Sequence, residues 1–318
     1  DYPVPDGAPS FKEHVASWAS ERHGLSCTSQ NVVAVHGAKL AVANAVDAFS
    51  APGDVVVVPT PGYPTYQNMV SERGRSLRWL TLREETGWLP SIDELRTAFR
   101  GAKMAYLNYP MNPTGAVANE TLLSQVVEVA RETGTTIVHD AAYLELAHQH
   151  TAPSILAQPG GWDVAIEVHS LSKAFHLCGW RVGFVLGAGD KLAEIRRVLG
   201  LVDTGPSRAS QLMAEVAMST ASDFPEGRRA RDAERTGYMA RILSELGCHV
   251  TAPGATFYLW FRPPEGKDGW DEIVKRAGVA CAPGEAFGPA GKGWVRFSCI
   301  QPITTYDEVG RRLAALWK

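Results

Sequence analysis

Six short runs rich in valine and other apolar residues alternate with helical patterns across the first two thirds of the chain. They lie at 32–35, 54–60, 102–109, 135–141, 164–171 and 181–187, and glycine or proline bounds several of them. Runs of this kind are typical of strands that are buried on both faces, and intervening helices favour βαβ units. The pattern therefore predicts an α/β domain built around a largely parallel sheet.

Helical spacing of apolar residues is clear in two of the intervening segments, 38–50 and 119–133. Asn119 stands where it can cap the first turn of the second helix, and Gly134 stands at its end. Beyond the sheet region, residues 226–247 predict a long charged helix that Gly247 ends.

Size and charge limit the classes of protein to consider. The chain has 318 residues, of which 45% are hydrophobic and 20% charged, so it is long enough to bury a large core. Its 31 basic and 34 acidic residues give a net charge of -3, which provides no basic surface for nucleic acid. No apolar stretch approaches the roughly 20 residues of a membrane span. We therefore expect small molecules as partners, with no nucleic acid and no membrane.

The five cysteines are scattered without the CxxC spacing of a metal or redox site. Their odd number argues against the disulfide framework of a secreted domain. No metal is predicted, and we expect a cytoplasmic enzyme.

The segment that most narrows the chemistry is SLSKAFHLCGWRVG, which contains Ser170, Lys173 and Arg181. A lysine beside a hydroxyl and an arginine at this separation can form an imine with an aldehyde cofactor while its neighbours bind the cofactor's phosphate. This combination indicates pyridoxal 5'-phosphate. Short motifs occur by chance, but three further segments follow a fixed order along the chain: HGAK at 36–39, NPTG at 112–115 and HDAAY at 139–143.

Together with PGYPTY at 61–66 and WVRFS at 294–298, this ordered set resembles the class I and II aminotransferases among the fold-type I pyridoxal phosphate enzymes. The resemblance covers nearly the whole chain. The nearest likeness is the LL-diaminopimelate aminotransferase branch, through YPMNPTGAV, IVHDAAYLEL and VAIEVHSLSKAF. It implies an α/β fold with a mostly parallel seven-stranded sheet flanked by helices, and a smaller C-terminal α+β domain. We place the large cofactor-binding domain at 1–235 and the small domain at 236–318.

Three residues are the catalytic candidates: Lys173, Asp140 and Tyr143. Lys173 would hold the cofactor as an imine and, once displaced by substrate, act as a general base. Asp140 ends a predicted strand, where ligand-facing residues of α/β sheets gather. A carboxylate there would keep the cofactor's pyridine nitrogen protonated. The structural alternative for Asp140 is a turn cap, and for Tyr143 a core aromatic.

The cofactor's phosphate requires hydrogen-bond donors and positive charge. Gly37, Ala38 and Lys39 stand between a strand and a helix, so their backbone N–H groups would face the anion. Ser170 and Arg181 would add a hydroxyl and a guanidinium. By similarity, Tyr2 would reach the phosphate of the neighbouring subunit and make the enzyme a homodimer, although a plain surface tyrosine is an equal alternative.

The remaining site candidates also follow from the resemblance. Asn112 and Tyr143 would hydrogen-bond the cofactor's phenolic oxygen, Asn112 would also contact the substrate, and Tyr63 would stack on the pyridine ring. Arg296, between Val295 and Phe297 in a strand-like run, would bind the substrate's alpha-carboxylate. For Asn112 the alternative is an ordinary Asn-Pro turn. For Tyr63 it is hydrophobic packing, and for Arg296 it is a structural ion pair.

Some features depart from the resembled pattern. His176 occupies a position where a small residue or asparagine is usual, and it would act either as an extra acid or base or as a packed histidine. The motif at Tyr2 lies some way into proteins of the resembled family, so we expect residues to precede Asp1.

Three functions are consistent with the sequence. The first is an aminotransferase that moves an amino group between an amino acid and a 2-oxo acid. The second keeps the cofactor but is a lyase, decarboxylase or cyclase acting on an amino acid such as an arginine derivative, because the same motifs serve all of these reactions. The third, a non-enzymatic sensor fused to a DNA-binding module, is not expected, because no basic or winged-helix segment precedes Tyr2 in this sequence. The aminotransferase is the leading hypothesis.

Overall fold

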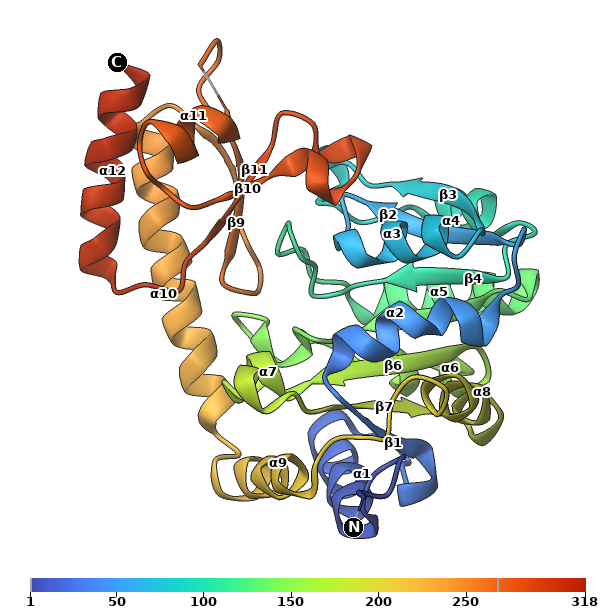
Figure 1. Ribbon diagram of the computed structural model, residues 1–318. Helices are drawn as coiled ribbons and strands as arrows, with labels where there is room; N and C mark the ends of the chain where they lie inside the picture. Colours follow the sequence, from blue (N-terminus) through green and yellow to red (C-terminus); the bar gives the residue numbers. More distant parts are fainter. Residues whose placement is uncertain (1, 268) are drawn as a thin grey trace.

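The computed structural model describes residues 2–267 and 269–318. Its larger sheet has seven strands in the order β1-β7-β6-β5-β4-β2-β3 (Figure 1). All neighbouring pairs are parallel except those of β7, which runs antiparallel to both β1 and β6. The predicted architecture is confirmed. The strands are β1 Val32–Val35, β2 Val55–Thr60, β3 Ser76–Thr81, β4 Met104–Leu107, β5 Thr136–Asp140, β6 Ala165–Ser170 and β7 Gly183–Gly187.

Strand β3 is absent from the six runs that the sequence identified. It forms one edge of the sheet and pairs only with β2 among the described strands. Of its six residues only Leu80 is buried, because the edge strand is partly open to solvent. Its sequence SLRWLT therefore lacks the continuous apolar character that identifies the central strands.

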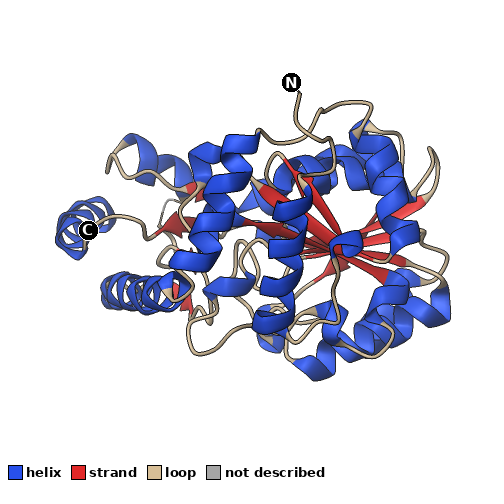
Figure 2. Ribbon diagram, turned by 90° about the horizontal axis from the view of Figure 1, so that it is seen from below, coloured by secondary structure: helices blue, strands red, loops and turns tan. Residues whose placement is uncertain are grey.

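Helices cover both faces of this sheet, as Figure 2 shows. On one face, α2, α3 and α8 pack on the strands. On the other face, α1, α4, α5, α6 and α9 do so. Among the described residues, no helix combines the length and apolar character needed to span a membrane. The bounds are α1 Pro9–His23, α2 Ala38–Phe49, α3 Pro64–Glu72, α4 Ile92–Phe99, α5 Glu120–Thr133, α6 Gly161–Val164, α7 Leu171–Ala174, α8 Gly189–Leu199 and α9 Arg208–Thr220.

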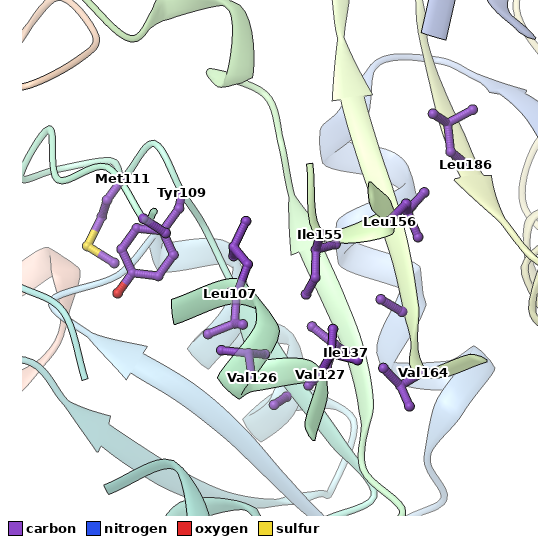
Figure 3. Packing of buried hydrophobic residues seen from close by; sticks show 14 of the residues in the cluster. Leu107, Tyr109, Met111, Val126, Val127, Ile137, Ile155, Leu156, Val164 and Leu186 are labelled. Atoms are coloured by element: carbon purple, nitrogen blue, oxygen red, sulfur yellow. The ribbon is translucent and has the colours of Figure 1, made fainter. Parts of the chain in front are cut away.

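Side chains of β5 alternate between the two faces of the sheet, and this alternation determines on which face Asp140 lies. Ile137 packs with Val126 and Val127 of α5 in the apolar cluster on the face that α1, α4, α5, α6 and α9 cover (Figure 3). Val138 belongs to the cluster beneath α2 and α3. Because successive side chains of a strand point to opposite faces, Asp140 lies on the same face as Val138.

A second sheet carries the C-terminal part of the chain. Its four strands are antiparallel in the order β10-β11-β9-β8, and they pack with α10 and α12 around a separate apolar cluster (Figure 1). Residue 235 lies inside α10, so the division into 1–235 and 236–318 stays a prediction. The elements are α10 Phe224–Glu245, β8 His249–Thr251, β9 Tyr258–Arg262, α11 Trp270–Lys275, β10 Ala282–Pro283, β11 Val295–Ser298 and α12 Ile303–Trp317.

The segment 249–264 contains two strands. β8 and β9 are separated by residues 252–257, where Pro253-Gly254 turns the chain and Thr256 has a φ of 68°. A positive φ is rare for a β-branched residue, so the break depends on hydrogen bonds that the sequence pattern does not reveal.

The N-cap of α5 gives a direct test of the local structure. The Asn119 side chain accepts a hydrogen bond of 2.9 Å from the Leu122 N–H. Replacing Asn119 with alanine should lower the free energy of unfolding by ~1 kcal/mol, measured by urea denaturation, because that N–H loses its partner. Asn119→Asp, which keeps an acceptor, should remain close to the parent; equal losses in both variants would contradict the capping role.

Candidate active site

A cavity of about 320 Å³ lies where the carboxyl ends of β4, β5 and β6 face the second sheet. Most of the residues that the sequence predicts for the site line it, although they are spread over most of the chain. Its walls are formed by Ala38, Lys39, Tyr63, Asn108, Asn112, Asp140, Ala142, Tyr143, Ser170, Ser172, Lys173, Arg181, Tyr258 and Arg296.

Asp140, the last residue of β5, provides a buried carboxylate to this cavity. Its Oδ2 accepts a hydrogen bond of 2.7 Å from the Tyr66 hydroxyl, and its Oδ1 accepts one of 3.2 Å from the Ala142 N–H. Burial raises the pKa of Asp140, and these two hydrogen bonds act in the opposite direction. A carboxylate held in this way is suited to a cationic or protonated partner, because such a partner offsets the cost of desolvation.

Tyr66 is itself held rigidly beneath the carboxylate. It is fully buried, and its ring stacks on that of Tyr106 at a centroid distance of 4.6 Å. Burial, together with the neighbouring Asp140, raises the pKa of the Tyr66 hydroxyl well above its usual value. The hydroxyl therefore remains a hydrogen-bond donor to Asp140 at all ordinary pH values.

Lys173 enters the cavity from α7, the short helix that follows β6. Ser170 caps this helix through a hydrogen bond of 3.3 Å from the Ser172 N–H to the Ser170 hydroxyl. The Lys173 side chain is half-buried, and no hydrogen bond or ion pair to its amine occurs within the described part of the chain. Its amine is thus positioned in the cavity without a competing carboxylate.

The residues predicted to bind an anion meet at one end of the cavity. Gly37, the N-cap of α2, has a φ of 77°, and a Cβ atom there would lie 2.6 Å from a terminal nitrogen of Arg181. The positive φ favours glycine here, and a side chain at this position would displace the Arg181 guanidinium. Arg181 is anchored by a hydrogen bond of 3.0 Å to the Cys178 carbonyl. The start of α2, the guanidinium and the Ser170 hydroxyl therefore share one region suited to a phosphate.

Arg296 reaches the cavity from β11 in the second sheet. One of its terminal nitrogens donates a hydrogen bond of 2.8 Å to the Asn112 side chain. The Arg296 Nε is buried and has no hydrogen-bond partner among the described residues. A buried donor without a partner is costly. The second terminal nitrogen of Arg296 also has no hydrogen bond among the described residues, which leaves it for an acceptor in the cavity.

A chain of hydrogen bonds links Arg296 to the strand that carries Asp140. The Asn112 N–H donates to the Asn108 side chain at 2.9 Å, and Asn108 donates to the Asp140 carbonyl at 2.7 Å. The two sheets are therefore joined through polar groups that also line the cavity.

Two tyrosines complete the lining. Tyr143 is buried, its hydroxyl lies 3.1 Å from that of Tyr258, and burial raises its pKa well above the usual value. Tyr63 precedes α3 and meets Tyr66 edge to face at 5.6 Å. Tyr258 and Asn108 are absent from the residues predicted for the site, as is Tyr66, which supports Asp140.

Of the candidates, Gly37, Tyr2 and His176 are not among the residues that line the cavity, and no hydrogen bond or ring contact among the described residues links the last two to it. Tyr2 is 88% exposed. His176 is exposed at a φ of 56°, and its ring meets Phe224 edge to face at 5.4 Å. Partial burial lowers the pKa of His176, and nearby arginines lower it further. The packed-histidine interpretation is therefore favoured over an acid or base role.

The cavity suits a planar cofactor that carries an aldehyde, a ring nitrogen and a phosphate. The Lys173 amine matches the aldehyde, and the Asp140 carboxylate matches a protonated nitrogen. The close approach of Gly37 and Arg181 matches the phosphate, while the Arg296 guanidinium matches the carboxylate of a second molecule. These residues fit pyridoxal phosphate together with an amino acid.

Comparison with known proteins places this site in context. The family model for aminotransferase class I and II matches residues 1–315. The LL-diaminopimelate aminotransferase of Nitratidesulfovibrio vulgaris (strain Hildenborough) is 34% identical over 322 residues, covering 99% of this chain and 83% of that protein.

Two solved structures are also similar to this chain along nearly its whole length. Substrate-bound BacF from Bacillus subtilis has a TM-score of 0.95 and 29% identity, with 99% of this chain and 82% of that chain covered. A probable N-succinyldiaminopimelate aminotransferase from Thermus thermophilus has a TM-score of 0.91 and 33% identity, with 97% of this chain and 84% of that chain covered.

The raised pKa of Asp140 predicts an unusual stability effect. A buried carboxyl with a raised pKa favours the folded state at low pH, and this contribution is lost as the pH rises through that pKa. Cofactor-free Asp140→Asn should therefore unfold at a higher temperature than the parent at pH 8. A difference of about 2–4 °C corresponds to roughly 1 kcal/mol.

The advantage should shrink as the pH falls, because the parent carboxyl then becomes neutral. Asp163→Asn, which changes an exposed carboxyl of α6, serves as the control and should behave like the parent at both pH values. An Asp140→Asn protein that is less stable than the parent at pH 8 would show that the carboxylate is not under desolvation strain.

Proposed function

The chain belongs to the class I and II aminotransferases, and from that premise we propose how its residues divide the work of amino-group transfer. The protein is a pyridoxal-phosphate-dependent enzyme of fold type I, and it moves an amino group between an amino acid and a 2-oxo acid. The observation that carries the residue assignments is the convergence of Lys173, Asp140 and Arg296 on one cavity. The lyase, decarboxylase or cyclase alternative is not favoured, since the named relatives are aminotransferases.

When bound, pyridoxal phosphate supplies an aldehyde that condenses with amines and a ring that withdraws electrons from the adjacent carbon. Lys173 would hold the cofactor through its amine. Once released, the same amine would take a proton from the substrate's alpha carbon and deliver it to the carbon that was the aldehyde. The absence of an ion pair to Lys173 among the described residues supports both roles, because no carboxylate holds the amine elsewhere.

Asp140 would hold the proton on the pyridine nitrogen. Its burial and the Tyr66 hydrogen bond support this role, because a positively charged partner would offset the cost of burying the carboxylate. Tyr63 would stack on the ring. Asn112 and Tyr143 would donate hydrogen bonds to the phenolic oxygen, with Tyr143 counted as catalytic because it tunes the cofactor's proton affinity.

The phosphate would be bound by Ser170, Arg181 and the turn Gly37-Ala38-Lys39 at the start of α2. A helix N-terminus and a guanidinium together give the donors and the charge that the dianion requires. Arg296 would bind the alpha-carboxylate of the substrate, and Asn112 would assist it. The position of Arg296 in the cavity lining and its second terminal nitrogen, which has no hydrogen bond among the described residues, support this assignment.

A homodimer is the assembly that we propose. Tyr2 would then reach the phosphate of the neighbouring subunit. The side chains of three apolar or aromatic residues are exposed: Tyr2 at 88%, Leu201 at 79% and Val202 at 55%. They provide apolar surface that a second copy of the chain would cover. A monomeric mass in solution, measured by light scattering, would contradict this assembly.

The cytoplasm is the location that we propose. Cys27, Cys178, Cys248, Cys281 and Cys299 are all free, which suits a reducing compartment. Finding the native protein with these thiols oxidised to disulfides would argue against it.

The amino donor is the least constrained part of the reaction. LL-diaminopimelate, named in the curated relative, is the first candidate, and it should be tested within a panel of amino acids, each with and without a 2-oxo acid. Mass spectrometry should find oxo-acid and amino-acid products in equal amounts, and only when both partners are present. Sustained turnover of an amino acid alone would instead favour a lyase or decarboxylase.

Lys173→Ala tests the central assignment. The variant should lose activity by about 10³-fold or more, because both the tether and the base are removed. Borohydride reduction of the loaded parent should attach the cofactor covalently at residue 173, as measured by peptide mass spectrometry. Lys39→Ala, which changes the other lysine of the cavity, should still show this attachment. A reduced adduct on the Lys173→Ala chain would refute the assignment.

A further inference from the structure

Tyr258, the first residue of β9, contacts Tyr143 and Arg296. Both of these residues have proposed roles in the site, whereas Tyr258 has not yet been given one. Its hydroxyl lies 3.1 Å from that of Tyr143. Its ring centroid lies 4.2 Å from the guanidinium carbon of Arg296. The side chain is buried and lines the cavity. One residue therefore stands between the cofactor side and the substrate side of the site.

The backbone around Tyr258 is fixed to the segment that follows Tyr143. The Thr256 N–H donates to the Leu146 carbonyl at 2.9 Å, and the Thr256 hydroxyl accepts from the Tyr258 N–H at 3.1 Å. Thr256 adopts its unusual positive φ within this arrangement. These hydrogen bonds set the spacing of the two tyrosines, so the contact between the hydroxyls is built into the fold.

The direction of the hydroxyl pair follows from the role of Tyr143. A tyrosine hydroxyl has one proton to donate, and Tyr143 needs that proton for the cofactor's phenolic oxygen. Tyr143 must then accept a hydrogen bond from Tyr258. Donation by Tyr258 polarises the Tyr143 O–H bond and strengthens the hydrogen bond that Tyr143 gives.

The ring of Tyr258 acts on a different partner. The Arg296 guanidinium lies over its face and also 5.0 Å from the centroid of Phe287. A cation held against aromatic faces is attracted by their negative potential. These rings and the hydrogen bond to Asn112 orient the guanidinium, while its second terminal nitrogen has no hydrogen-bond partner among the described residues.

We propose that Tyr258 is a positioning residue for amino-group transfer: its hydroxyl orients Tyr143 toward the cofactor, and its ring orients Arg296 toward the substrate carboxylate. The inference rests on the proposed roles of Tyr143 and Arg296. The hydroxyl and the ring of Tyr258 would thus have different functions. One variant can remove the hydroxyl alone, and another can remove the hydroxyl and the ring together.

Tyr258→Phe removes the hydroxyl and keeps the ring. A hydrogen bond donated to the phenolic oxygen competes with the proton that this oxygen shares with the neighbouring nitrogen, so weakening it raises the cofactor's proton affinity. The pH midpoint of the absorbance change of the loaded enzyme should rise by roughly half a pH unit. KM for the amino acid should change little, because the contact with Arg296 remains.

Tyr258→Leu removes both contacts. It should show the same upward shift of the pH midpoint and, in addition, a KM for the amino acid raised roughly 3- to 10-fold, because Arg296 loses its aromatic support. Tyr306→Phe is the matched control: Tyr306 is also buried, and its hydroxyl bonds the Gln301 carbonyl outside the cavity. Neither the midpoint nor KM should change in that variant.

A double variant separates action through Tyr143 from any direct effect. In a Tyr143→Phe background, adding Tyr258→Phe should cause no further shift of the midpoint. A shift for Tyr143→Phe but none for Tyr258→Phe would overturn the inference and leave the proposed function intact. No shift for Tyr143→Phe would remove the role of Tyr143 itself, and the inference with it. Cofactor content and circular dichroism confirm that each variant is folded and loaded.

Discussion

The buried carboxylate of Asp140 is the interaction on which the site depends. It ends a central strand, so the sheet places it at the bottom of the cavity, and hydrogen bonds from Tyr66 and the Ala142 N–H fix both of its oxygens. Burial makes its negative charge costly without a cation. In the proposed complex, a protonated ring nitrogen in the cavity would offset that cost, and the same pairing would give the cofactor its electron-withdrawing strength.

The second sheet completes the site by bringing Arg296 over the first. Its hydrogen bond to Asn112, and those from Asn112 to Asn108 and from Asn108 to the Asp140 carbonyl, join the group proposed for the substrate to the strand proposed for the cofactor. In the proposed complex, placement of substrate and cofactor would therefore depend on one continuous polar network, in which Asn108 and Asn112 are buried.

The sequence predicted the parts of this arrangement that are encoded locally. Lys173, Asp140 and Arg181 stand at strand ends or in adjacent turns, where short motifs and buried valine runs identify them. The same reasoning missed β3, whose edge position leaves it half-exposed. Tyr258 was also missed, because its partners Tyr143 and Arg296 are brought to it only by the packing of the two sheets.

Direct observation of the proton that Asp140 holds is the sharpest test of this account. Pyridoxal phosphate labelled with ¹⁵N at the ring nitrogen can be bound to the enzyme and examined by NMR at pH 8. The account predicts the chemical shift of a protonated pyridine nitrogen in the parent enzyme and of an unprotonated one in Asp140→Asn. An unprotonated nitrogen in the parent enzyme would contradict it.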